Sequence, residues 1–212
     1  MDRELGIKDN FHQIGVSKLT VQGWMGAIAG VLSLGGFLPY WWAIWQGKTR
    51  PNRATWWIWS IVGVIIALSY RASGADSTIW VPISYVIGPL VTSLFALKFG
   101  EGGWTKLDRI CLVGVGIGLI LWVVYRSPYL ALGINIGIDF LGALPTIRKS
   151  LRHPEGEDLL AWSLFTIANL LNFLAIDRWR WEIVVYPIYM FLVCSTICSI
   201  LWWGRRKRKK LI

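Results

Sequence analysis

The stretch Gly36-Phe37-Leu38-Pro39, followed seventeen residues after its proline by Trp56, decides the fold because it occurs twice. It returns 106 positions later as Gly142-Ala143-Leu144-Pro145, and Trp162 again follows the proline by seventeen residues. A repeat of this kind in an apolar chain indicates a duplicated architecture.

The chain around this repeat has the composition of a membrane protein. Of its 212 residues, 55% are hydrophobic and 16% charged, and the mean hydropathy is +0.50. Seven apolar stretches have roughly the length that spans a membrane, and six of them contain no Asp, Glu, Lys or Arg. They are too long and too uniformly apolar for barrel strands, so we expect an all-α membrane protein with seven transmembrane helices. The predicted spans are 23–46, 54–70, 78–97, 110–125, 127–147, 159–176 and 183–204.

Lysine and arginine are distributed unevenly between the two sides of these spans. Fifteen of the 22 follow the first, third, fifth and seventh spans. By the positive-inside rule, the amino terminus is predicted outside and the carboxyl terminus in the cytoplasm. Six consecutive basic residues, Arg205 to Lys210, directly follow the last span, where we expect them to contact anionic lipid headgroups rather than nucleic acid.

The repeat also predicts a topology. Spans one to three and five to seven are the two copies, and the proline pair Pro82-Ile83 and Pro187-Ile188 matches at an offset of 105 in the third helix of each. The extra fourth span restores the orientation, which gives two parallel copies related by an axis along the membrane normal. The predicted parts are an extramembrane segment 1–22, a first repeat 23–97, a loop and linker helix 98–126, a second repeat 127–204 and a cytoplasmic tail 205–212.

This pattern of three helices, one linker helix and three more helices (3+1+3) resembles the SWEET and PQ-loop (MtN3-like) membrane transporters. The resemblance covers about 23–204 and is carried by the paired Leu-Pro dipeptides, the basic loops after them and the tryptophan that opens the next helix of each copy. The Pro-Gln of the family is Pro39-Tyr40 and Pro145-Thr146 here. The resemblance implies transport of a small polar solute, such as a sugar or an amino acid, by alternating access. The same scaffold also includes a retrieval receptor for escaped lumenal proteins, so a receptor that binds without transport is the alternative.

Two prolines lie inside predicted helices and are hinge candidates. Pro39 and Pro145 each remove an amide donor and leave the carbonyl four residues earlier without its usual partner, which makes these points bendable. The resemblance implies that such prolines act as hinges, whereas a static kink is the alternative. We expect Pro82 and Pro187 in the first turn of their helices, where proline costs little.

Asp139 is the only charged side chain inside any predicted span. A charge near the middle of a membrane helix costs about 2.5–3.5 kcal/mol on insertion scales, so it should face the bundle interior or a wet cavity. Asn135 lies one turn earlier on the same face, and Asn169 and Asn172 lie near the middle of the sixth span. These residues predict an asymmetric substrate site between the copies, in which Asp139 takes a cation, a hydroxyl or a proton. The alternative is a protonated Asp139 that joins helices.

Trp59 and Phe165 occupy matching positions in the second helix of each copy and are candidates for stacking on a solute, although packing in the core or the aromatic belt is the more ordinary role. We expect no catalytic residue, metal or cofactor, because no second ionisable side chain lies at the depth of Asp139 and the two histidines fall in loops on opposite sides. The expected location is the cell membrane, and a homo-oligomer is compatible with the sequence.

Overall fold

The protein is a bundle of long helices, described here by a computed structural model that covers residues 20–102, 105–125 and 128–209. Within these ranges all regular elements are helical, as the composition predicts. They are α1 (Val21–Trp45), α2 (Arg53–Ala72), α3 (Trp80–Phe99), α4 (Lys106–Tyr125), α5 (Pro128–Arg152), the short 3-10 helix η1 (Pro154–Gly156), α6 (Leu159–Leu174) and α7 (Trp181–Lys209). Most of the predicted amino-terminal segment and the last three tail residues lie outside the described residues.

Matching capping residues begin the two helices that carry the repeated tryptophans. Asn52 caps α2 and Asp158 caps α6, and each side chain accepts a hydrogen bond from the backbone N–H three residues later, at 3.0 and 2.7 Å. Short polar side chains at this position satisfy an N–H that has no partner within the helix. As a result, Trp56 and Trp162 are both the fourth residue of their helices.

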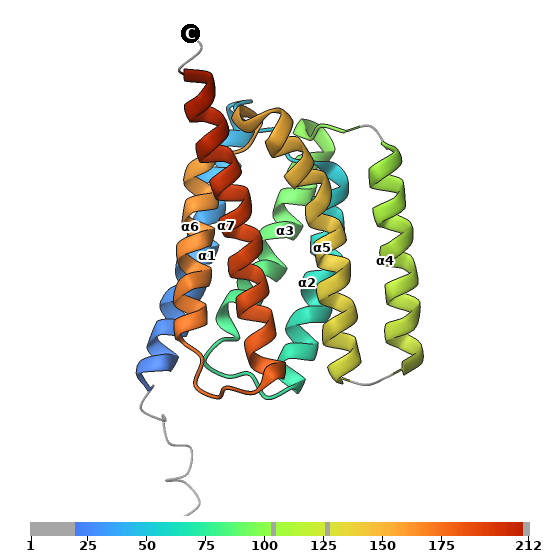
Figure 1. The fold of residues 1–212 in the computed structure, drawn as a ribbon, viewed down its shortest axis with the longest axis vertical. Helices are drawn as coiled ribbons and strands as arrows, with labels where there is room; N and C mark the ends of the chain where they lie inside the picture. The colour runs from blue at the N-terminus through green and yellow to red at the C-terminus, as the bar shows by residue number, and fades with distance from the viewer. Residues whose placement is uncertain (1–19, 103–104, 126–127, 210–212) are drawn as a thin grey trace, which may run out of the picture.

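The helices pack in two groups of three with α4 at the edge (Figure 1). In the first group α3 contacts both α1 and α2, and in the second α7 contacts both α5 and α6. The groups meet where α1 contacts α6 and where α2 contacts α5, while α4 packs mainly on α5. Helices α1, α3, α5 and α7 run toward one end of the bundle and α2, α4 and α6 toward the other (Figure 1).

The outer surface of the bundle is apolar. Large hydrophobic side chains that are more than half exposed include Val31, Leu38, Leu68, Leu97, Val124, Leu160 and Leu192. Within the described ranges, α1, α2, α3 and α7 are long and apolar enough to cross a membrane, and α6 is a shorter apolar helix. An exterior of this kind is suited to lipid rather than water. The chain is therefore a multi-pass integral membrane protein.

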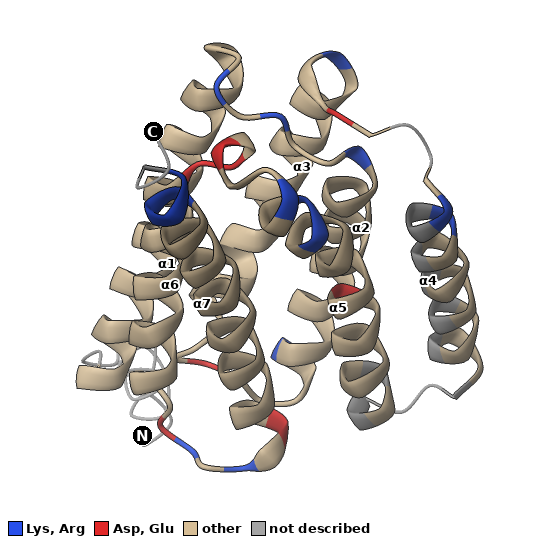
Figure 2. Cartoon of the chain, turned by 45° about the horizontal axis from the view of Figure 1, so that its top comes forward, with Lys and Arg blue, Asp and Glu red and all other residues tan. Residues whose placement is uncertain are grey.

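Apart from one acidic residue in the middle of α5, the charged residues gather at the two ends of the bundle, and most of the basic ones lie at the end where α1, α3, α5 and α7 finish (Figure 2). We call this the basic end and the other the opposite end. The described basic residues of the basic end are Lys48, Arg50, Arg53, Lys98, Lys106, Arg109, Arg148, Lys149, Arg152 and Arg205 to Lys209. Those of the opposite end are Arg71, Arg178 and Arg180.

The positions of the prolines agree with the sequence in three of four cases. Pro39 lies inside α1 and Pro145 inside α5, and Pro82 is the third residue of α3. The prediction for Pro187 is wrong, because α7 begins at Trp181 and the proline is its seventh residue. It therefore lies beyond the first turn and frees a carbonyl that needs another donor.

Candidate functional site

A small cavity lies in the middle of the bundle between the two groups of helices. Asp139 from α5 lines it together with Trp59 from α2 and Phe165 from α6, so three of the six predicted binding residues reach one space. Further walls come from α3 and α7 through Tyr85 and Tyr186. The space open to the centres of water-sized molecules is about 30 Å³. This volume exceeds the 10–15 Å³ or so that one water needs, yet it is far smaller than a sugar site.

Asp139 is held by contacts to two neighbouring helices. The Tyr189 hydroxyl on α7 donates a hydrogen bond to its Oδ2 atom at 2.6 Å, and the Trp59 indole on α2 donates to its backbone oxygen at 3.1 Å. The residue is only 7% exposed. These contacts fix the carboxylate at the cavity wall.

Asn169 lies directly behind the cavity wall. Its side-chain amide donates to the Tyr85 hydroxyl at 2.8 Å and to the backbone oxygen of Phe165 at 2.8 Å, and it lies 3.5 Å from the Cys194 sulfur. Tyr85, Phe165 and Cys194 all line the cavity. Asn169 therefore positions cavity residues and does not itself line the cavity.

Asn135 and Asn172 lie away from the cavity wall. Both side chains are fully buried, and neither has a hydrogen-bond partner among the described residues. Neither belongs to the cavity lining. The structure thus brings Asp139, Trp59 and Phe165 together, places Asn169 behind them, and leaves Asn135 and Asn172 outside this group.

A buried carboxylate closes the basic end of the bundle. Glu157, in the loop before α6, has no exposed surface. Its Oε2 atom accepts hydrogen bonds from the Tyr40 hydroxyl at 2.8 Å and the Trp162 indole at 3.0 Å, and Lys149 donates to its Oε1 atom at 2.8 Å. We call these four residues the Glu157 network. It joins α1 of the first group to α5 and α6 of the second.

Lys149 and the backbone of Glu157 extend the Glu157 network to three further segments. The Lys149 ammonium also donates to the backbone oxygen of Arg50 and lies 3.6 Å from the Glu101 carboxylate. Arg205, near the end of α7, donates to the backbone oxygen of Glu157. The loops that follow α1 and α3 are therefore tied to the second group at the basic end.

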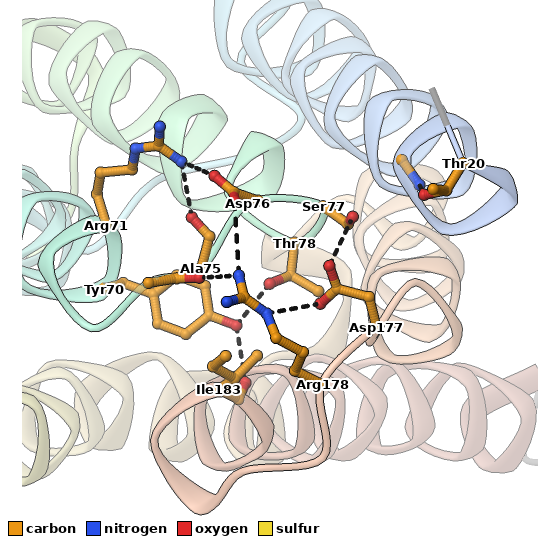
Figure 3. A network of polar contacts seen from close by, with 12 residues as sticks. Thr20, Tyr70, Arg71, Ala75, Asp76, Ser77, Thr78, Asp177, Arg178 and Ile183 are labelled. Atoms are coloured by element: carbon orange, nitrogen blue, oxygen red, sulfur yellow. Dashed lines mark hydrogen bonds and ion pairs between the residues drawn. The ribbon is translucent and has the colours of Figure 1, made fainter. Parts of the chain in front are cut away.

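A second set of polar contacts joins the two groups at the opposite end (Figure 3). Asp76, in the loop before α3, forms ion pairs with Arg71 and, at 3.5 Å, with Arg178 in the loop before α7. Asp177 accepts a hydrogen bond from the Ser77 hydroxyl at 3.2 Å. We call these five residues the Asp76 network. Its ion pairs are exposed, unlike those of the Glu157 network.

Tyr70 supplies the donor that Pro187 removes. Its hydroxyl donates to the backbone oxygen of Ile183, four residues before this proline, at 2.7 Å, and lies 2.8 Å from the Thr78 hydroxyl (Figure 3). The carbonyl freed by the proline is thus satisfied by a side chain from the other group. The Tyr70 ring also packs on Tyr186 of the cavity wall, with ring centroids 5.2 Å apart.

The Glu157 network reaches the wall of the central cavity, and on the other side Tyr70, rather than the Asp76 network, packs against that wall. Trp162 belongs to the Glu157 network and also lines the cavity, and Tyr186, which packs on Tyr70, lines it from the other side. Trp162 of the Glu157 network and the ring pair Tyr70–Tyr186 thus lie on opposite sides of the cavity, toward the two ends of the bundle.

Sequence reasoning missed Glu157, Tyr70 and Pro89. Glu157 falls in a polar loop whose composition is typical of an exposed segment. Tyr70 is the last residue of an apolar span, where an aromatic residue is expected to lie at the membrane interface. Pro89 lies inside α3 and lines the cavity. The signal that could have found it is the position of this proline inside the predicted span 78–97, where it frees a carbonyl as Pro39 and Pro145 do.

The chain matches no family model, no curated protein and no solved structure. The resemblance to the SWEET and PQ-loop families therefore rests on the motifs of the sequence alone.

Proposed function

We propose that the protein is a membrane transporter that moves a small polar solute by alternating access. The observation that carries this proposal is the central cavity with Asp139 in its wall, which lies between the Glu157 network at one end of the bundle and the Asp76 network at the other. Each network joins the first group of helices to the second. Movement of one group against the other would break one network while the other holds, which is what alternating access requires.

Exchanged contacts between the groups support the view that they are two copies of one unit. Gly36 of α1 packs against Phe165 of α6, where an added Cβ would come within 2.8 Å of the ring. Gly142, which corresponds to Gly36 at the offset of 106, packs in the same way against Ile58 and Trp59 of α2. Trp59 corresponds to Phe165 at the same offset. Such reciprocal contacts are expected of copies related by a two-fold axis.

A second pair of contacts, within the groups, supports the same duplication. The Ser84 hydroxyl on α3 donates to Ser33 on α1 at 2.7 Å, and the Tyr189 hydroxyl on α7 donates to Asp139 on α5 at 2.6 Å. Ser33 and Asp139 are 106 residues apart, and Ser84 and Tyr189 are 105 apart. The two copies thus share a contact between their first and third helices. The acceptor is the Ser33 hydroxyl in the first copy and the Asp139 carboxylate in the second.

The proposal includes seven crossings and a defined orientation. Helices α4, α5 and α6 run alongside the four long apolar helices (Figure 1), which supports the proposal that they cross the membrane too. The excess of lysine and arginine at the basic end favours a cytoplasmic position for that end, with the amino terminus outside. The basic tail on α7 would then meet anionic headgroups of the cell membrane.

The hinge candidates have places that suit this motion. Pro39 lies in α1, one residue before Tyr40 of the Glu157 network, and Pro145 lies in α5, four residues before Lys149 of the same network. Bending at either proline would move a partner of Glu157. We infer that the two prolines open the basic end.

Solute counterflow in proteoliposomes tests the proposal. Purified protein is reconstituted with sugars, amino acids, nucleosides and amines in turn, and exchange of labelled solute is measured. We expect saturable exchange of one class, and its loss in the variants Asp139→Asn and Asn169→Ala. Ser195→Ala serves as the matched control, because the hydrogen bond that the Ser195 hydroxyl donates within the described part of the chain is exposed and goes to the Leu192 carbonyl of the same helix.

The outcomes separate function from site assignment. Undiminished exchange in both folded variants would remove the assignment of the cavity as the substrate site. Saturable binding without exchange of any solute would contradict transport and favour a receptor on the same scaffold.

A further inference from the structure

The wall of the central cavity is built mainly from aromatic rings. They come from both groups of helices and are Trp56, Trp59, Tyr85, Trp162, Phe165 and Tyr186. Neighbouring rings form a continuous series, with centroid distances of 5.1 Å from Trp56 to Trp59, 6.3 Å from Trp59 to Trp162 and 5.6 Å from Trp162 to Phe165. The other lining residues, apart from Asp139, are mostly small or apolar.

Asp139 is the only carboxylate among the described residues that line the cavity, and no described basic side chain lines it. Among the described residues, no Lys, Arg or His forms an ion pair with Asp139. Tyr189 donates a hydrogen bond to its Oδ2 atom at 2.6 Å. A carboxylate so far from water must either carry a proton or meet a cation.

The chemistry of the wall does not suit a sugar. A sugar site needs several donors and acceptors placed around the ring hydroxyls, because unpaired hydroxyls lose their bonds to water on burial. Here the hydroxyls of Tyr85 and Tyr189 are already engaged, by Asn169 and Asp139. Besides Asp139 and the aromatic rings, the described wall offers a ligand few polar groups, chiefly the Tyr186 hydroxyl and the Trp56 indole N–H, which has no hydrogen-bond partner among the described residues.

A single carboxylate within a series of aromatic rings is suited to an organic cation. The faces of Trp, Tyr and Phe attract a positive charge within about 6 Å, by about 2 kcal/mol when water is excluded. A quaternary ammonium or a protonated amine carries such a charge on a small apolar body, and it would neutralise Asp139. We propose that the cavity binds a small organic cation of this class, with Asp139 as its counter-ion and the rings as its cage.

This inference rests on the proposed function, because it names the substrate class of the same site. The present cavity, at about 30 Å³, is too small for a quaternary ammonium ion and must widen to admit one. The widening is the motion that transport requires, so the closed conformation described here is the resting or the occluded one.

A matched pair of ligands tests the charge requirement. Choline and 3,3-dimethylbutan-1-ol have almost the same shape, but the alcohol has a neutral carbon in place of the charged nitrogen. Binding of each to the purified full chain is measured by titration calorimetry, with glucose as a third probe. We expect choline to bind at least about tenfold more tightly than the neutral analogue and glucose. Equal affinity for choline and the analogue, tighter binding of glucose, or no binding of choline would overturn the proposal.

Two variants assign the effect to the cavity. Asp139→Asn keeps an acceptor for Tyr189 and removes the charge, so choline should lose its advantage over the neutral analogue. If that variant does not fold, Trp59→Leu removes one ring of the cage and leaves the carboxylate, and it should weaken choline binding by several fold. Trp57→Leu is the control, because Trp57 is an exposed neighbour on α2 that does not line the cavity. Choline binding that survives both cavity variants and falls in the control would also overturn the proposal.

These results can be told apart from failure of the proposed function. Choline binding without counterflow keeps the cation site and removes transport. Counterflow of a sugar without choline binding keeps transport and removes the cation site.

Discussion

Glu157 has no exposed surface, and Lys149 beside it is only 5% exposed in its side chain. Buried pairs of this kind add little net stability when intact, but loss of one partner leaves the other charge buried without compensation. If the Glu157 carboxylate were replaced, Tyr40 and Trp162 would also lose a fully charged hydrogen-bond acceptor. The Glu157 network is therefore the place where a single substitution should matter most.

Glu157→Gln should destabilise the protein by about 3–5 kcal/mol, because Lys149 stays buried without its main counter-ion. The measurement is the thermal unfolding midpoint of detergent-purified protein, compared with wild type. Asp76→Asn is the matched control in the Asp76 network. Its ion pairs are exposed, so it should change stability by no more than about 1 kcal/mol. Equal losses in the two variants would contradict the difference between the ends.

At the residue scale, the sequence draws attention to Asp139 because a lone charge in an apolar span needs a special environment, and the structure places this residue in the cavity wall. The sequence could not separate Asn169 from Asn135 and Asn172. All four residues are near mid-span, and only the positions of α3 and α7 decide which of them contacts the cavity wall. The burial of the Glu157 carboxylate could not be predicted for a related reason, because it depends on Tyr40, which lies 117 positions earlier in the chain.

The helices themselves were easier to predict than the contacts between them. Long apolar stretches must become helices in a membrane, and the capping residues Asn52 and Asp158 mark where two of them begin. The start of α7 was less apparent, because Trp181 and Glu182 extend the helix before its apolar stretch begins, and Pro187 consequently lies beyond the first turn. Tyr70 compensates for that proline from another helix, which no local pattern records.

Two adjacent glycines in α1 provide a test of the interface between the groups. An added Cβ at Gly36 would come within 2.8 Å of the buried Phe165 ring, whereas at Gly35 it would meet nothing within 4 Å. Gly36→Ala should therefore destabilise the bundle by about 1–3 kcal/mol through overpacking of α1 against α6. Gly35→Ala should be neutral or stabilise by up to about 1 kcal/mol. Thermal unfolding of the two variants measures the difference, and equal midpoints would contradict the packing of α1 on α6.

At the scale of the whole molecule, the two ends differ in how firmly they are closed. The basic end is held by a buried carboxylate with three side-chain partners, and the opposite end by exposed ion pairs together with the bond from Tyr70 to Ile183. Exposed pairs contribute little because water and salt screen them. We therefore expect the opposite end to open more readily, so that the cavity is reached first from the side predicted to lie outside.

The central claim is that the two groups of helices open the cavity at one end at a time. Electron-resonance distance measurements in proteoliposomes test it most directly, with one pair of spin labels at Lys48 and Glu155 at the basic end and another at Ala72 and Trp179 at the opposite end. All four positions are exposed, and each pair joins the two groups. Addition of the transported solute should lengthen one distance population while the other pair stays short, and Glu157→Gln should lengthen the basic-end distance. The account would be contradicted if each pair kept one unchanging distance under all of these conditions. It would also be contradicted if both pairs showed long distances at the same time.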